Sequence, residues 1–299
     1  MTNTSRTSEA DPGAFRPPRL DPLFTATLSP QAARMLVDLV YQHSRIRLGP
    51  ERQPMLANRL RRRLRTLGLG GFDEYCALLQ SPQGPEEIEH LVDLISTNHT
   101  GFFREPDHFT FLTNRVLPAL APSLAAAGAP LRVWSAAASS GEEPYTLAMV
   151  LAEFFRTSPA VPWQVEASDI SRRMLEHAQQ GIYRLDARHN LPPELLRRYF
   201  QRGVGVRSGT CRVKAELRER VRFRRINLFQ AEYPVPRDQH VIFCRNVMIY
   251  FDPPSRAILI QKLTRHLAPG GFLLIGHSES LLGIRHGLES ARQSIYRKP

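Results

Sequence analysis

The apolar positions near the start of the chain follow a helical period. Between residues 28 and 96 they form three stripes separated by polar residues, and each stripe predicts one buried helix face. We therefore expect a small all-α domain at 28–96. The stripes are Ala33, Leu36, Val37 and Val40; Met55, Leu56, Leu60, Leu64 and Leu67; and Ile88, Leu91, Val92 and Ile95.

Residues 1–27, ahead of this domain, have no sustained apolar period. They combine four prolines with small polar residues, a composition that cannot bury enough apolar surface to fold. A disordered leader is expected there.

A different pattern begins near residue 130, where short apolar runs alternate with amphipathic helices. This alternation is typical of an α/β domain with a mainly parallel sheet. Open sheets of this kind bind ligands beyond the carboxyl ends of their strands, so we expect the functional site there. The predicted strands are 131–134, 164–167, 240–243 and 272–275, and the predicted helices lie near 143–156, 171–180 and 255–267.

The ends of the first two predicted strands suit a nucleoside. Small residues from Ser135 to Gly141 let the backbone approach a ligand closely. The second strand ends at Asp169, whose carboxylate can accept hydrogen bonds from ribose hydroxyls. The sequence lacks both the spaced glycines of dinucleotide sites and the Gly-Lys-Ser/Thr ending of phosphate-binding loops. S-adenosylmethionine, a nucleoside without phosphates, fits this pattern.

Each of these features also has a purely structural interpretation. Asp169 could be only the N-cap of the helix that begins near Ser171. Glu142 and Glu143 could merely complement the positive end of their helix, and the small residues could form an ordinary turn. The combination of features favours a cofactor site.

The charge of the chain adds a class of partner. Its 299 residues carry a formal charge of +12 at pH 7, and such a surface attracts nucleic acid, anionic lipid or a glutamate-rich protein. Around the second apolar stripe stand five arginines with no acidic residue among them: Arg59, Arg61, Arg62, Arg63 and Arg65.

Several classes of protein are disfavoured by the composition. No apolar stretch approaches the roughly 20 residues of a membrane-spanning helix, and the N-terminus lacks the apolar core of a secretory signal. The three cysteines lie far apart and form neither a disulfide framework nor a metal-binding pattern. A soluble cytoplasmic protein without a metal cofactor is expected.

Four blocks of sequence, in order, resemble the signatures of the CheR-type chemotaxis receptor methyltransferases, which are protein-glutamate O-methyltransferases. The resemblance covers nearly everything after the leader, and the segment His277 to Ser280 fits it as well. The blocks are Thr97 to Glu105 followed by His108 and Phe109, Trp134 to Tyr145, Ala167 to Ile170, and Ile242 to Phe251.

The resemblance implies a two-domain organisation. The all-α domain at 28–96 would be followed by a linker and connecting helix at 97–125. A Rossmann-like S-adenosylmethionine-dependent methyltransferase domain would occupy 126–299, with an antiparallel last strand near 294–296. A small β-subdomain would be inserted at about 200–225.

The resemblance also implies a reaction, the methylation of glutamate side chains on chemotaxis receptors (methyl-accepting chemotaxis proteins) in sensory adaptation. The cofactor would be S-adenosyl-L-methionine and the product S-adenosyl-L-homocysteine. A glutamate carboxylate, with a pKa of about 4.3, is already an anionic nucleophile at neutral pH. Catalysis would then consist chiefly of positioning, with no general base.

By similarity, nine residues are assigned to the cofactor. Arg104 would bind the methionine carboxylate and Glu143 its ammonium group, while Asp169 would accept from the ribose. Asn227 would hydrogen-bond adenine and Leu228 would pack on its ring. The full set is Asn98, Thr100, Arg104, Glu143, Asp169, Asn227, Leu228, Arg245 and Asn246.

Two of the residues in these blocks are catalytic candidates. Arg104 and Tyr250 would orient the incoming carboxylate. Alternatively, Arg104 pairs with Glu105 or Asp107 on the surface, and Tyr250 is a buried ring with a satisfied hydroxyl.

Two surfaces are predicted to bind the receptor. Arg59, Arg62 and Arg63 would contact its glutamate-rich cytoplasmic methylation helices, unless they form only a solvated face. Residues Gly203, Gly205 and Gly209 resemble a loop that binds a receptor C-terminal pentapeptide by adding a strand, although glycines also simply make turns. We expect a monomer that is recruited to membrane receptor arrays without inserting into the membrane.

Two other functional classes are alternatives to receptor methylation. A basic methyltransferase could modify RNA or DNA, with its N-terminal domain binding phosphates. Enzymes that methylate base amino groups often carry Asp or Asn, two prolines and an aromatic residue after the fourth strand, whereas this chain has Arg245 to Met248 there. A non-catalytic adaptor is disfavoured because the predicted cofactor residues are all present.

Overall fold

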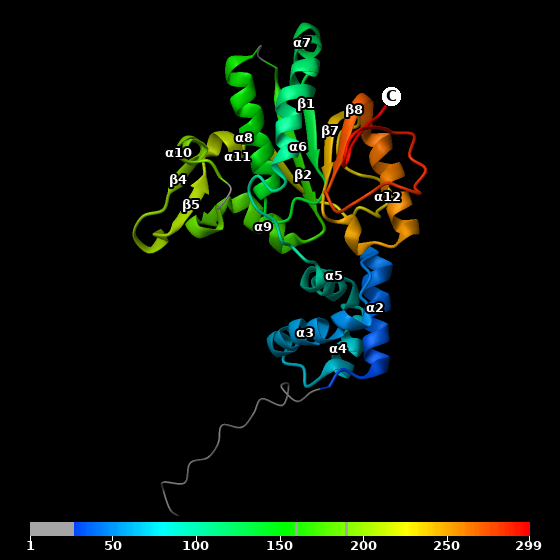
Figure 1. Cartoon of the computed structure of the whole chain (residues 1–299). Coiled ribbons are helices and arrows are strands. Elements are labelled where there is room, and N and C mark those ends of the chain that lie inside the picture. The colour runs from blue at the N-terminus through cyan, green and yellow to red at the C-terminus, as the bar shows by residue number, and fades with distance from the viewer. Residues whose placement is uncertain (1–26, 159–160, 189–190) are drawn as a thin grey trace, which may run out of the picture.

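The computed structural model describes residues 27–158, 161–188 and 191–299. It contains an all-α domain, an α/β domain and a small separate sheet (Figure 1). All but the last residue of the predicted disordered leader, 1–27, lies outside the described residues. Among the described residues, no helix combines the length and hydrophobicity needed to cross a membrane.

The all-α domain is a bundle of helices around one apolar core. Ser29 caps the first helix by accepting a hydrogen bond from the Ala32 N–H at 3.1 Å, and Gly68 ends the second in the left-handed conformation. The three predicted stripes face inward, and a further helix, α4, was not predicted because it is short. The helices are α2 (Pro30–Ser44), α3 (Gln53–Leu67), α4 (Phe72–Leu79) and α5 (Gly84–Ile95).

A connecting segment leads from this bundle to the large sheet. It consists of α6 (Pro106–Phe111), a π-helical turn (Leu112–Val116) and α7 (Leu117–Ala127). Its inner face packs in the same hydrophobic cluster as α8 (Glu142–Thr157), against one face of the sheet. The linker is therefore part of the α/β core.

The large sheet has seven strands in the order β6-β2-β1-β7-β8-β10-β9. The first five run parallel, and β10 pairs antiparallel with both β8 and β9. This confirms the predicted Rossmann-like fold and its antiparallel last strand. The strands are β1 (Leu131–Ser135), β2 (Trp163–Asp169), β6 (Val221–Arg225), β7 (Gln239–Cys244), β8 (Leu267–Ile275), β9 (Glu289–Arg292) and β10 (Ile295–Arg297).

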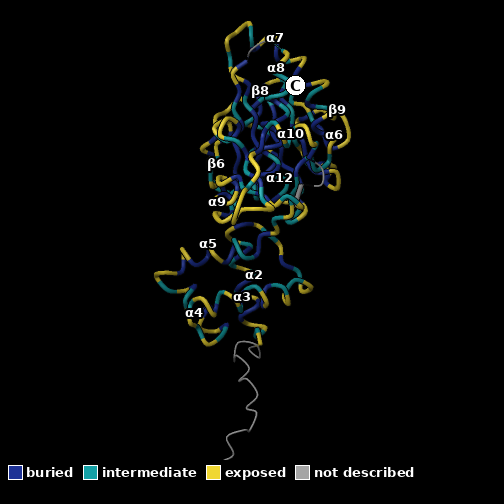
Figure 2. Tube along the Cα trace, turned by 90° about the vertical axis from the view of Figure 1, so that its left-hand side faces the viewer, coloured by how far each residue is buried: buried dark blue, intermediate teal, exposed yellow. Residues whose placement is uncertain are grey.

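Successive residues of the central strands point to opposite faces and enter two different hydrophobic clusters. Val241 and Phe243 join the cluster that contains α8, whereas Ile242 and Cys244 join the cluster that contains α12 (Pro253–His266). Figure 2 shows these buried segments in the middle of the α/β domain. Both faces of the sheet are covered, which explains why its strands read as continuous apolar runs.

The small sheet differs from the predicted subdomain at both ends. Its strands are β3 (Ile182–Arg184), β4 (Phe200–Arg202) and β5 (Thr210–Val213), antiparallel in the order β3-β5-β4. The predicted range of about 200–225 missed β3 and wrongly included β6, which pairs with β2 in the large sheet. As an edge strand, β6 carries arginines between its apolar residues, so its sequence does not resemble a core strand.

The all-α domain packs beneath the carboxyl ends of the strands, as Figure 1 shows. Tyr41 of α2 donates to Asp252 at 2.5 Å, and the Arg47 N–H donates to the Tyr250 carbonyl at 2.9 Å. Arg225 at the end of β6 pairs with Glu89 of α5 at 2.7 Å. The two domains thus meet at the edge of the sheet where a ligand is expected.

Candidate active site

An open cavity lies where the two domains meet. Its walls come from the all-α domain, from the linker and from the loops that follow β1, β2, β6 and β7. The structure brings all nine predicted cofactor residues and Tyr250 to this one cavity: Asn98, Thr100, Arg104, Glu143, Asp169, Asn227, Leu228, Arg245, Asn246 and Tyr250 all line it.

Of the two glutamates at the start of α8, only Glu143 lines the cavity. Its Oε1 accepts from the Ser135 hydroxyl at 2.7 Å, and its Oε2 accepts from Arg245 at 3.2 Å. Glu142 instead accepts from Ser140 at 2.6 Å. Burial raises the pKa of Glu143, and Arg245 and Ser135 offset that rise only in part.

The turn ahead of α8 requires a glycine. Gly141 has φ +98°, and a Cβ on it would come within 2.8 Å of both the Ala178 Cβ and the Tyr183 hydroxyl. A larger residue would therefore clash with these two side chains and displace the helix start, and Glu143 with it.

Asp169 ties the loop after β1 to the loop after β2. Its Oδ2 accepts from the Ser139 N–H at 2.8 Å and its Oδ1 from the Ser171 N–H at 2.9 Å. The N-cap interpretation is wrong, because Ser171 itself caps the next helix, α9 (Arg172–Gln180), by accepting from Met174. Burial raises the pKa of Asp169, and these N–H donors counteract part of the rise. Each carboxylate oxygen retains capacity for a further donor.

Arg245 is the most deeply buried charge at the site, with a side chain only 1% exposed. Its guanidinium contacts Glu105 at 3.0 Å and Glu143 at 3.2 Å, and it also donates to the Arg104 carbonyl. Because Glu105 pairs with Arg245, the alternative in which Arg104 forms a surface pair with Glu105 is wrong. Arg104 instead donates to the His99 carbonyl at 2.7 Å.

Glu105 ends the first stretch of the four sequence blocks, and the resemblance assigns it no role in the site. Burial alone would raise the pKa of Glu105, but hydrogen bonds from Asn246 and Arg245 hold it below its usual range. Its Oε1 accepts from the Asn246 side chain at 3.0 Å. The ionised carboxylate of Glu105 thus organises both residues that follow β7.

Asn227 lines the cavity and also joins the two domains. Its Nδ2 donates to the His43 carbonyl of α2, and its Oδ1 accepts from the Phe229 N–H at 2.9 Å. Each end of the amide has one protein partner and retains capacity for another, so the adenine bond stays a prediction. Leu228 is buried and lines the cavity, as expected for a residue that packs on a ring.

Tyr250 is partly exposed, which contradicts the interpretation as a buried ring. The guanidinium of Arg52, from the all-α domain, lies 5.2 Å from the centre of its ring. Arg52 also lines the cavity. Sequence reasoning missed Arg52, since no local pattern indicates that this residue reaches the other domain.

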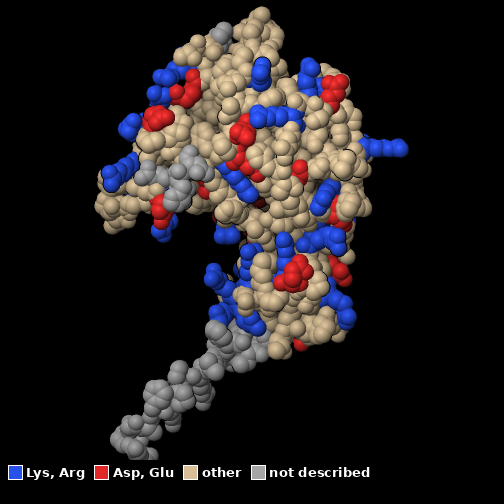
Figure 3. Space-filling model, viewed as in Figure 1, with Lys and Arg blue, Asp and Glu red and all other residues tan. Residues whose placement is uncertain are grey.

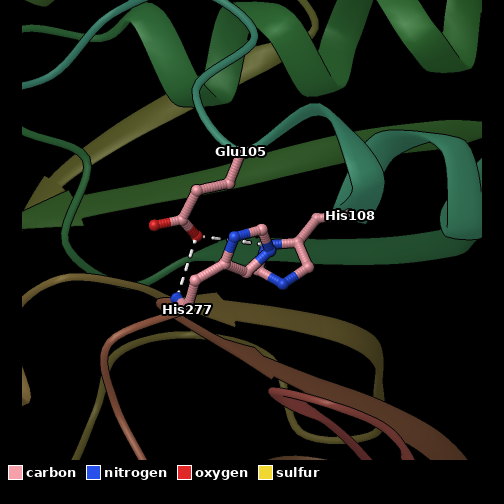
Figure 4. A group of neighbouring side chains, drawn as sticks. All are labelled: Glu105, His108 and His277. Carbon is pink, nitrogen blue, oxygen red and sulfur yellow. Dashed lines mark hydrogen bonds and ion pairs between the residues drawn. The ribbon is translucent and has the colours of Figure 1, made fainter.

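Glu105, His108 and His277 form a cluster of potential metal ligands beside the cavity, drawn in Figure 4. The Glu105 Oε2 that faces both rings already accepts from Arg245 at 3.0 Å and from the His277 N–H at 3.2 Å. Burial, followed by the nearby Arg245 and His277, lowers the pKa of His108 to about 3, so its ring is neutral. A guanidinium on the same oxygen disfavours a metal ion, and we interpret the cluster as part of the Arg245 network.

Two family models together match most of the chain. Residues 98–297 match a family model described as CheR methyltransferase, SAM binding domain, and residues 31–96 match one described as CheR methyltransferase, all-alpha domain. The chain belongs to the CheR methyltransferase family. Its cofactor is S-adenosylmethionine, and its activity is that of a chemotaxis protein methyltransferase.

Curated relatives share this description over most of their length. The chain is 42% identical over 269 residues to a chemotaxis protein methyltransferase of Escherichia coli K12, covering 90% of this chain and 91% of the relative. It is 40% identical over 257 residues to chemotaxis protein methyltransferase 2 of Pseudomonas aeruginosa (86% and 89%). It is 39% identical over 266 residues to the chemotaxis protein methyltransferase of Borreliella burgdorferi (88% and 92%).

Two of the three arginines predicted to bind the receptor of this CheR methyltransferase are held by contacts within the all-α domain. Arg59 donates to the Leu94 carbonyl at 2.6 Å and to two further carbonyls at the end of α5. Arg63 donates to the two carboxylate oxygens of the buried Glu87 at 3.0 Å and 2.6 Å. Glu87 also accepts from the Tyr75 hydroxyl at 2.7 Å. Arg62 is exposed. Figure 3 shows basic side chains gathered on the all-α domain where it borders a hollow below the α/β domain.

The three glycines of the predicted tail-binding loop lie between β4 and β5 and make its turn. Gly205 and Gly209 have φ +58° and +83°, and a Cβ on Gly203 would come within 2.2 Å of the Arg207 carbonyl oxygen. The turn also presents Val204 and Val206 to solvent, 81% and 106% exposed.

Asp169→Ala should weaken binding of S-adenosylhomocysteine and also destabilise the protein. The substitution leaves the buried N–H groups of Ser139 and Ser171 without their acceptor, so the free energy of unfolding should fall by about 1–3 kcal/mol. Calorimetry and denaturant unfolding would measure the two effects, with the exposed Asp73→Ala as a control. Unchanged cofactor affinity in a destabilised variant would leave Asp169 a purely structural role.

Proposed function

We propose that this CheR methyltransferase transfers a methyl group from S-adenosylmethionine to glutamate side chains of chemotaxis receptors, forming methyl esters. The observation that carries the proposal is the composition of the cavity. It brings the predicted cofactor residues together with Tyr250 and two arginines, Arg52 and Arg104, that can receive a carboxylate.

The residues present fit the cofactor. Glu143 offers an anionic partner for the ammonium of the methionine part, and Arg104 offers donors for its carboxylate. Asp169 has free acceptor capacity for ribose hydroxyls, and the buried Leu228 supplies an apolar surface for the adenine. When bound, S-adenosylmethionine supplies an electrophilic sulfonium methyl group.

The chain's own residues then have to position a nucleophile that is already charged. A glutamate side chain has a pKa of about 4.3, so no base is needed to activate it. Tyr250, with Arg52 over its ring and Arg104 elsewhere in the cavity wall, would hold one carboxylate oxygen in line with the methyl group to be transferred. Transfer of the methyl group from bound S-adenosylmethionine would form a C–O bond and break the C–S bond, whose electron pair would stay on sulfur and cancel its positive charge.

Receptor contacts are proposed on two surfaces. The exposed face of α3 around Arg62 would attract the acidic methylation helices. The β4–β5 turn, with its exposed valines, would bind a receptor C-terminal pentapeptide as an added strand on β4, which is an edge of the small sheet. The protein would act as a cytoplasmic monomer recruited to membrane receptor arrays.

The product bond tests the proposed reaction. Labelled methyl groups should enter receptor cytoplasmic fragments and leave as volatile methanol in mild alkali, because a carboxylate methyl ester hydrolyses under those conditions. RNA and DNA should stay unlabelled in parallel assays. Alkali-stable label in nucleic acid, with none released from receptor fragments, would contradict the proposal.

Arg62→Glu should slow methylation of receptor fragments at low salt while leaving cofactor affinity unchanged, because it reverses an exposed charge remote from the cavity lining. The charge-matched control is the exposed Arg115→Glu on the connecting segment. Arg63→Ala should instead lower the free energy of unfolding by about 1–3 kcal/mol, since it removes the ion-pair partner of the buried Glu87 and leaves only the Tyr75 hydroxyl. Equal rates of receptor-fragment methylation for Arg62→Glu and wild type would show that the exposed face of α3 is only solvated and does not bind the receptor.

Cofactor affinity should fall as the pH is lowered. Burial raises the pKa of Glu143 in the free protein, so this carboxylate takes up a proton at a higher pH than an ordinary glutamate. An ammonium group beside it favours the charged form, so binding should release protons as the pH falls through the raised pKa. Calorimetry with S-adenosylhomocysteine in two buffers of different ionisation enthalpy measures this release.

Glu143→Gln should abolish the proton release, whereas Glu142→Gln should preserve it because Glu142 does not line the cavity. The assignment of Glu143 to the ammonium would fail if the wild-type protein released no protons at any acidic pH.

A further inference from the structure

The carboxylate of Glu279 accepts four backbone hydrogen bonds from two different loops. Oε1 accepts from the N–H groups of Met248 at 2.7 Å and Ile249 at 3.3 Å. Oε2 accepts from those of Gly276 at 2.6 Å and Asn246 at 2.9 Å. Glu279 follows β8 and is 9% exposed. It lies in the segment from His277 to Ser280, to which the resemblance assigns no role in the site.

The loop that Glu279 holds is the one after β7. It carries Asn246 and Tyr250, both of which line the cavity, whereas Glu279 does not line it. Asn246 has φ +57°, in the left-handed region that few residues other than glycine adopt, although asparagine does so more often than most. Such a conformation persists only where surrounding contacts enforce it.

Two carboxylates provide those contacts from opposite sides. Glu105 accepts from the side chain of Asn246 at 3.0 Å, and Glu279 accepts from its backbone N–H. Gly276 packs closely against Asn246, since a Cβ on Gly276 would come within 2.5 Å of the Asn246 Nδ2 and 2.9 Å of its backbone nitrogen. The conformation of Asn246 is therefore fixed through both its backbone and its side chain.

We propose that Glu279 is a positioning residue for methyl transfer, which sets the conformation of residues 246–250 and thereby the placement of Tyr250 in the cavity. It acts through the loop and does not touch the substrate. The inference rests on the proposed role of Tyr250 in orienting the incoming carboxylate.

A carboxylate suits this role better than a neutral side chain. Its two oxygens are acceptors only, so both can face converging N–H groups. A glutamine in the same place would turn an NH₂ group toward two of those N–H donors. Burial raises the pKa of Glu279, and the four backbone N–H groups offset part of that rise by binding the charged form.

The test combines Glu279→Gln with two measurements on the full-length protein. Hydrogen exchange should speed up for the amides of Asn246, Met248 and Ile249, with little change in peptides from the all-α domain. The kcat for receptor fragments should fall by about 100-fold with little change in KM, because a displacement of about 1 Å in a positioning group has an effect of that size. The control is Glu289→Gln, an exposed glutamate of β9.

A second variant, Glu279→Asp, keeps the carboxylate but shortens its reach. It should show exchange rates and a kcat between those of wild type and Glu279→Gln. Faster exchange of the loop with a wild-type kcat would overturn the inference, as would loss of the native fold in both variants. If wild-type protein itself fails to methylate receptor fragments while the loop amides remain protected, the proposed function fails and not the structural role of Glu279.

Discussion

The buried guanidinium of Arg245 is the interaction on which the rest of the site depends. A charge this deeply buried is tolerated only with partners, and removing one partner of a buried pair costs about 3–5 kcal/mol. Its partners come from different parts of the chain: Glu105 from the linker, Glu143 from α8, and the Arg104 carbonyl. Because Arg245 itself follows β7, one side chain fixes three walls of the cavity relative to one another.

The same carboxylates that organise the fold also carry the chemistry proposed for the cavity. Glu143 binds Ser135 and Arg245, and Asp169 binds two backbone N–H groups, yet each lines the cavity and keeps acceptor capacity for a ligand. Burial raises the pKa of both, which means that a cationic or hydrogen-bonding ligand relieves part of the desolvation cost. Substitution at these positions should therefore affect stability and binding together.

A local sequence pattern predicted the position of Asp169 for a physical reason, whereas Glu143 was assigned by the resemblance. Apolar runs identify parallel strands, and the carboxyl ends of parallel strands meet at one edge of the sheet. Contacts between distant segments leave no such pattern. The basic stripe of α3 could not show that Arg59 and Arg63 bind groups of α5, nor could the region around Asn227 show that its amide reaches α2. The strand β6 was misassigned because an edge strand needs only one apolar face.

The all-α domain contributes to the cavity as well as to the basic surface. Arg52 reaches Tyr250, and the backbone of Arg47 binds the carbonyl of the same tyrosine. On the proposed mechanism, this arrangement meets a requirement that is specific to an anionic nucleophile. A strong ion pair with the ground-state carboxylate would slow its attack, because tight binding of the substrate raises the barrier. Arg104 already donates to a carbonyl and Arg52 already lies over an aromatic ring, so neither approaches the carboxylate as a bare charge. Both can orient the nucleophile while holding it less tightly than a buried charge pair would.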